Sequence, residues 1–121
     1  MALAARMMGG GISAAQALAI NGDLNTSVSA AGTTQGTATA INAGIVIVTT
    51  AAASSGVILP ACMPGDEMDI LNLGSNAVTI YPDSSSQINA IAVNTGILLA
   101  TNTAIKLRRF TSTRWMGFLS A

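Results

Sequence analysis

The chain has 121 residues, enough for one domain, and its five basic and five acidic side chains give a formal net charge of zero. Half of the residues are hydrophobic, but only 3% are aromatic and 8% are charged, against roughly 25% charged residues in ordinary soluble domains. This neutral composition argues against nucleic-acid binding through a basic surface, and the absence of histidine excludes Ser–His–Asp and Cys–His nucleophile systems.

Residues 1–25 are expected to form an extended N-terminal arm, with the folded domain spanning residues 26–121. The first eleven residues are rich in Ala, Met and Gly and carry no turn or strand pattern of their own. Two interpretations remain open for them: an arm that lies on a partner surface, or a disordered leader. Residues 12–21 are similarly ambiguous between a two-turn helix and extended structure, and the extended form is favoured because so short a helix is marginal alone.

The same region partly resembles a signal peptide. Arg6 precedes an apolar stretch, and Ala17-Leu18-Ala19 has the composition of a cleavage site. The glycines at 9–11 interrupt the apolar stretch, so secretion is not expected. No run in the chain approaches the roughly 20 uninterrupted apolar residues that a membrane-spanning helix needs.

The sequence pattern of the domain predicts a series of short strands. Alternation predicts a strand near residues 37–41, and the β-branched run at 45–50 predicts a second one that is covered on both faces. Residues 56–59 lead into a predicted central hairpin, in which 68–73 pairs with 78–81 across Gly74-Ser75-Asn76.

Further strands are expected near residues 87–93 and 97–99. A last hairpin is predicted between residues 103–110 and 114–119, with Ile105 and Leu107 on one face and Lys106 and Arg108 on the other. Strands that recur every 8–12 residues are typical of all-β proteins. The predicted fold is therefore a small antiparallel β-barrel or jelly-roll-like sandwich.

The acidic residues Asp66, Glu67 and Asp69 form one cluster in the sequence. They could ligate a hard cation such as Ca²⁺, or act as a carboxylate pair in glycoside hydrolysis. A solvated strand face or a salt-bridged one is the favoured interpretation, because carboxylates mostly stay in water. Cys62 is the only cysteine and is expected to be a small buried hydrophobe. We therefore expect no catalysis, no metal and no cofactor.

The basic residues Lys106, Arg108, Arg109 and Arg114 gather on the last hairpin. We expect this patch to meet the acidic strand or the carboxylates of a partner. Trp115 is expected to lie in the core rather than to act as a stacking platform.

Several spaced segments resemble a module of tailed-phage virion proteins. They are AGTTQGTATA at 31–40, GVILP at 56–60, NLG at 72–74, VTIYP at 78–82, Ile88-Asn89 and the final Trp115. The resemblance covers about residues 31–119 and is to the small proteins that decorate or cement phage heads, and to the same β-module at the base of head fibres. It implies a homotrimer of β-barrels bound to the capsid lattice, without catalysis.

The expected function is thus that of a decoration or cement protein, assembled in the host cytoplasm and located on the capsid surface of the virion. Its expected partners are the major capsid protein and copies of itself, with no nucleic acid, membrane or small-molecule substrate. The alternative is a head-fibre or adhesin-type module that recognises host glycans. The residues expected to make capsid or subunit contacts are Arg6, Met7, Met8, Ile12, Lys106, Arg108, Arg109 and Arg114.

Overall fold

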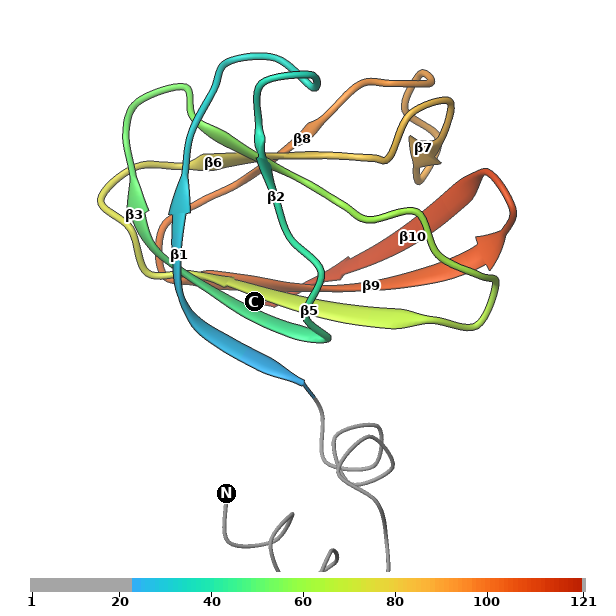
Figure 1. Ribbon diagram of the computed structural model, residues 1–121, viewed down its shortest axis with the longest axis horizontal. Helices are drawn as coiled ribbons and strands as arrows, with labels where there is room; N and C mark the ends of the chain where they lie inside the picture. The colour runs from blue at the N-terminus through green and yellow to red at the C-terminus, as the bar shows by residue number, and fades with distance from the viewer. Residues whose placement is uncertain (1–22, 121) are drawn as a thin grey trace, which may run out of the picture.

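A computed structural model describes residues 23–120, and this part of the chain consists of strands and loops without a helix (Figure 1). The strands are β1 (Leu24–Ala30), β2 (Thr39–Ala40), β3 (Ile45–Ala51), β4 (Gly56–Ile58), β5 (Glu67–Asn72), β6 (Val78–Tyr81), β7 (Gln87–Ile88), β8 (Ile97–Leu99), β9 (Thr103–Thr111) and β10 (Arg114–Leu119). The prediction of an all-β protein is therefore confirmed.

The strands form two sheets that the chain visits in alternation. Sheet A has six strands in the order β1-β3-β5-β9-β10-β7, and sheet B has four in the order β2-β4-β6-β8. The strands β1, β3 and β5 pair in parallel in sheet A, and β2, β4 and β6 pair in parallel in sheet B. β1 with β2, β3 with β4, and β5 with β6 each make one coil, and these three coils stack. This arrangement is a β-solenoid.

The expected barrel or jelly-roll sandwich is therefore wrong, as is the central hairpin. β5 and β6 are consecutive but lie in different sheets, where β5 pairs with β3 and β9, and β6 pairs with β4 and β8. Parallel and antiparallel strands share the same two-residue alternation of side chains. The pattern identified most of the strands, although it missed β1 and extended β7 beyond its two residues. It contained no information on the direction in which strands pair.

The segment between β5 and β6 is a corner of the coil rather than a hairpin turn. The buried Asn72 side chain donates to the carbonyl oxygens of Asn76 and Leu99 and accepts a bond from the amide of Gly74. The Asn76 side chain donates to the carbonyl of Ala51, at the end of β3 in the preceding coil. These side chains satisfy backbone groups that a turn between sheets would otherwise leave unpaired.

The C-terminal part adds antiparallel strands to the solenoid. β8 pairs with β6 in sheet B, while β9 pairs with β5 and β10 with β9 in sheet A. The last hairpin is thus confirmed, with β9 and β10 joined at residues 112–113. In Figure 1, β5, β9 and β10 cross the lower part of the molecule and β6 and β8 lie above them.

The core lies between the two sheets. In β3, Val46 and Val48 are fully buried while the flanking Ile45 and Ile47 are half-buried, so that the strand alternates between the core and the outer face of sheet A. The largest fully buried side chain is Trp115 on β10, as expected from its sequence context. Packing small branched side chains in facing strands is how a chain with few aromatic residues fills its interior.

The expected N-terminal arm lies largely outside the described residues. Its last two residues, Leu24 and Asn25, belong to β1 and pair with Ile45 and Val46 of β3. In the part of the chain that the structure describes, no helix is long and apolar enough to cross a membrane.

Candidate functional site

The charged residues on the outer face of sheet A form a compact group, here called the charged ladder: Glu67, Asp69, Lys106 and Arg108. β5 and β9 are antiparallel neighbours, so Glu67 lies opposite Arg108 and Asp69 opposite Lys106. The Lys106 ammonium is 3.7 Å from a carboxylate oxygen of each acidic residue, and the Arg108 guanidinium is 3.1 Å from Glu67. The expectation that the basic residues of the last hairpin meet the acidic strand is confirmed for Lys106 and Arg108.

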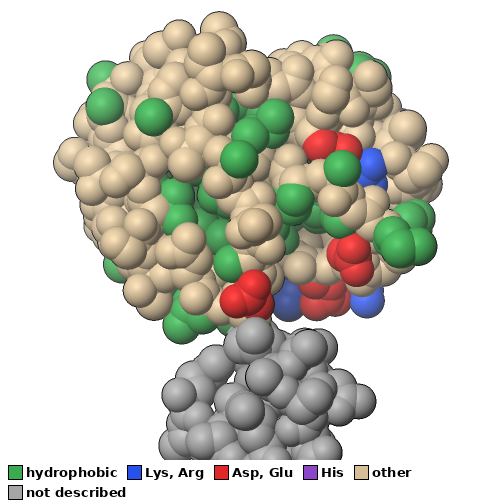
Figure 2. Space-filling model, viewed as in Figure 1, with side chains coloured by type: hydrophobic (Ala, Val, Ile, Leu, Met, Phe, Trp, Pro, Cys, Tyr) green, Lys and Arg blue, Asp and Glu red, His purple; other side chains and the backbone are tan. Residues whose placement is uncertain are grey.

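The charged ladder remains open to solvent. Between 44% and 52% of each of its four side chains is exposed. Exposed pairs of this kind contribute about 1 kcal/mol or less to stability, because water and salt screen them. Figure 2 shows acidic and basic side chains gathered along the lower margin of the molecule, on the side where β5 and β9 run. The ladder therefore contributes little to the stability of the fold.

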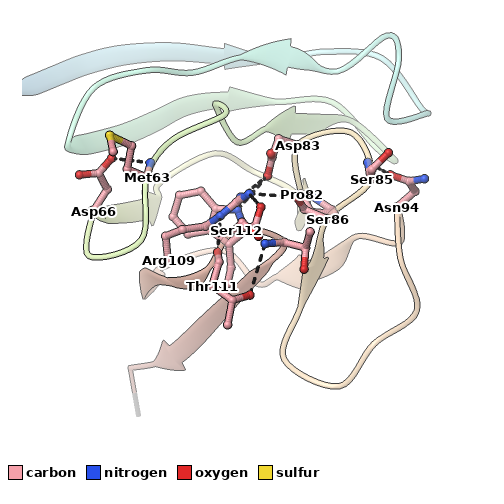
Figure 3. A network of polar contacts seen from close by, with 12 residues as sticks. Met63, Asp66, Pro82, Asp83, Ser85, Ser86, Asn94, Arg109, Thr111 and Ser112 are labelled. Atoms are coloured by element: carbon pink, nitrogen blue, oxygen red, sulfur yellow. Dashed lines mark hydrogen bonds and ion pairs between the residues drawn. The ribbon is translucent and has the colours of Figure 1, made fainter.

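Arg109 has a different environment from its neighbours. It follows Ile105 and Leu107 on the inward face of β9, and only 3% of it is exposed. Its guanidinium is 2.5 Å from Asp83 Oδ1 and also donates to Ser86 Oγ and to the carbonyl oxygens of Thr111 and Ser112 (Figure 3). The structure thus separates Arg109 from the surface residues with which the sequence grouped it.

Asp83 completes this buried group. Its Oδ1 atom also accepts a bond from Trp115 Nε1 at 3.0 Å, and the Arg109 guanidinium lies 5.3 Å from the Trp115 ring centroid. We call Arg109, Asp83, Ser86 and Trp115 the Arg109 cluster. It joins the last hairpin to the loop after β6, so that strands from both sheets are tied together by charge-assisted hydrogen bonds.

The Arg109 cluster determines the ionisation of Asp83. Burial by itself raises the pKa of this carboxyl group, but hydrogen bonds from Arg109 and then Trp115 outweigh burial, and the pKa lies below its ordinary value. Asp83 is therefore held as a carboxylate inside the protein. Each member of the cluster is bonded to another member, which fixes the positions of all four side chains.

The remaining predicted contact residues lie elsewhere. Arg114 begins β10 at the exposed end of the last hairpin, opposite Thr111 of β9 and Gln87 of β7. Arg6, Met7, Met8 and Ile12 lie outside the described residues. The structure thus brings Lys106 and Arg108 together on one face and places Arg114 at the end of the hairpin.

A hollow of about 200 Å³ lies beside Cys62 and Trp115. Burial, and secondly the charge of Asp66, raise the pKa of the Cys62 thiol, which lowers its thiolate fraction and its reactivity. Asp66 lies in the turn after Pro64-Gly65, as expected, where it accepts a hydrogen bond from the amide of Met63. Within residues 23–120, no three His, Cys, Asp or Glu side chains are placed to hold a metal ion.

The pairing of Asp83 with Arg109 was not predicted from the sequence. Asp83 lies in the loop after β6, where Ser86 is buried and Asp83 pairs with Arg109. The sequence nevertheless contained an indication of this pair. The two-residue alternation of a strand places Arg109 on the same face as the apolar residues Ile105 and Leu107. A cation on the inward face of a strand requires a buried anion, and only five acidic residues were available.

Comparisons of the chain with models of protein families, with curated proteins and with solved structures found no match.

Proposed function

We propose that this protein is a structural component of a tailed-bacteriophage head, a decoration or cement protein that binds the major capsid protein and stabilises the shell. The observation that carries the proposal is the nature of the surface. Within residues 23–120, eight large hydrophobic side chains are exposed, namely Leu24, Met63, Leu73, Val93, Leu98, Phe110, Phe118 and Leu119. The rest of the surface is dominated by small neutral residues.

Charge does little to keep this surface in solution. Four of the charged residues neutralise one another in the ladder, and Asp83 and Arg109 do so in the interior. A neutral surface with exposed apolar side chains favours association, because little charge repulsion opposes it. Such a surface suits a protein that works covered by a shell and by other copies of itself.

The body of the protein also supports the proposal. The strands of the stacked coils are paired within two sheets, and the Arg109 cluster links both sheets. A rigid body loses little conformational freedom on binding, so more of its contact energy is available to hold capsid subunits together. Repetition of the contact around a shell raises the strength of attachment further.

Cosedimentation with capsids that lack the protein tests this function. We expect the chain to pellet with the capsids up to a fixed copy number and to raise the temperature at which they rupture. Arg114→Glu should weaken binding, whereas Arg114→Lys should retain it, because Arg114 is an exposed cation at the end of the hairpin. Failure to bind capsids together with binding to bacterial cells would contradict the proposal and support the glycan-binding module instead.

A further inference from the structure

The outer face of sheet A has a symmetric arrangement of side-chain types. From β3 to β10, its central strands present an apolar column, an acidic column, a basic column and a second apolar column. The columns are Ile45 and Ile47 on β3, Glu67 and Asp69 on β5, Lys106 and Arg108 on β9, and Met116 and Phe118 on β10. The centre of this pattern falls between β5 and β9, which is also the centre of the six-stranded sheet.

The strand registers align these columns into rows. One row runs from Ile45 through Asp69 and Lys106 to Phe118, and the next contains Glu67, Arg108 and Met116. A third row joins Ile47, Leu71 and Ala104. The first row ends in an apolar residue on both sides, the second ends in Met116 on the β10 side, and the third is apolar throughout. The two charged rows have opposite charges on the two sides of the centre.

A two-fold axis in the plane of this face, parallel to the strands and between β5 and β9, reverses the order of the columns. The acidic column of one copy then lies opposite the basic column of the other. In the same two-fold arrangement, Ile45 of one copy faces Phe118 of the second copy, and Leu71 faces Ala104 of the second copy. The face is therefore complementary to itself, which is the condition for an isologous dimer interface.

The shape of the face is compatible with such a dimer. A hollow of about 370 Å³ lies beside Phe118 and is lined by residues of β9 and β10, among them Ala104, Lys106 and Leu119. The two-fold operation brings Ile45 and Ile47 of the second copy toward this hollow. Six strands about 4.8 Å apart, two to nine residues long, offer roughly 600 Å² per copy. The total area then reaches the lower end of the range for stable interfaces, about 1,200 Å².

We propose that two copies of this chain associate through the outer faces of their six-stranded sheets, with the charged ladders of the two copies interleaved. Among residues 23–120, sheet B packs on the inner face of sheet A and no strand packs on the outer one. In the dimer, each carboxylate of the ladder gains a cation from the second copy in addition to its own. The inference is independent of capsid binding, because it rests on the arrangement of this face alone.

The mass of the full chain in solution is the first test. Light scattering during size-exclusion chromatography should give twice the chain mass, and dilution should shift the equilibrium toward the monomer. A three-fold mass would overturn the proposal and support the trimer that the phage resemblance implies. A monomer at every concentration would also overturn the proposal. The outer face of sheet A would then be left for residues 1–22 or for a shell protein to cover.

Charge reversal gives a sharper test. The double variants Glu67→Lys/Asp69→Lys and Lys106→Glu/Arg108→Glu each place like charges opposite one another across the two-fold axis. We expect each variant alone to be monomeric and their equimolar mixture to restore a dimer that contains one copy of each. Circular dichroism of each variant shows whether it is folded. Folded variants that remain dimeric alone, or a mixture that stays monomeric, would contradict the proposed interface.

Phe118→Glu tests the apolar columns with a matched control. Phe118 on sheet A is 57% exposed, and Leu98 on the outer face of sheet B is 69% exposed. We expect Phe118→Glu to weaken dimerisation by at least about tenfold, and Leu98→Glu to leave it unchanged. If Leu98→Glu disrupts the dimer and Phe118→Glu does not, the interface lies on sheet B and the proposal fails.

Discussion

Asp83 is the acidic side chain on which the interior depends most. Its carboxylate accepts bonds from both Arg109 and Trp115, and 13% of the side chain is exposed. The Arg109 guanidinium is more deeply buried and has no other carboxylate among its described partners. Removing the negative charge would therefore leave a buried cation without its counterion.

We expect Asp83→Asn to lower the free energy of unfolding by about 3–5 kcal/mol, because breaking one side of a buried ion pair leaves the other charge uncompensated. Urea denaturation followed by circular dichroism measures this loss. Glu67→Gln serves as the control, since it removes half-exposed ion pairs and should cost about 1 kcal/mol or less. Equal losses in the two variants would contradict the structural role assigned to Asp83.

The same residue predicts a pH dependence. The pKa of Asp83 is lower in the folded protein than its ordinary value of about 3.9, so its contribution is fully present above that value. The contribution is lost as the pH falls through the lower, folded pKa. Between pH 5 and pH 2, the urea midpoint of the wild type should fall more steeply than that of Asp83→Asn. Parallel profiles would show that Asp83 makes no such contribution.

The residues of the last hairpin show that the alternation of side chains along a strand could predict which face each residue lies on. Ile105, Leu107, Lys106 and Arg108 lie on the faces that alternation predicted, and Trp115 lies in the core as expected. The pairing of Arg109 with Asp83 was not predicted, because it joins segments 26 residues apart through a loop. Its partner depends on how the sheets stack, which alternation within a strand does not specify.

At the level of elements, the corner between β5 and β6 shows how closely the coils approach. A Cβ atom on Gly74 would lie 2.7 Å from Cβ and 2.8 Å from the amide nitrogen of Ala51 in the preceding coil. These distances are below van der Waals contact, and the nitrogen belongs to the backbone. The corner therefore requires a residue without a side chain.

Gly74→Ala should accordingly destabilise the protein by about 1–3 kcal/mol, the usual cost of adding a methyl group to a packed site. Gly36→Ala is the matched control, because nothing lies within 4 Å of a Cβ atom at that position. The thermal midpoints of the two variants measure the difference. A Gly74→Ala variant as stable as Gly36→Ala would show that the coils can separate at this corner without cost.

This corner also explains why the solenoid was not predicted. Gly74-Ser75-Asn76 has the composition of a hairpin loop, and the runs on either side have the length and alternation of paired strands. The deciding bonds are made by Asn72 and Asn76 to carbonyl groups of β8 and β3, far away in the sequence. Local composition therefore predicted a turn, while its connection to two different sheets depended on long-range contacts.

On the scale of the whole molecule, the stacking predicts an uneven distribution of local stability. β3 and β5 are paired on both sides within sheet A, whereas β2 lies at an edge of sheet B and has only two residues. We expect amide hydrogens in β3 and β5 to exchange at least about tenfold more slowly than those of β2. Mass-spectrometric hydrogen exchange on the full chain measures this. Uniform protection across both sheets would contradict the layered arrangement.

Trp115 is the only tryptophan of the chain, it is 1% exposed, and it lies beside the Arg109 guanidinium. Its fluorescence is therefore an intrinsic probe of one junction, the contact of the last hairpin with the loop after β6. A red shift in emission that precedes the loss of the far-ultraviolet β signal would show this junction opening before the coils unfold. Simultaneous changes would show that the hairpin and the coils unfold as one unit.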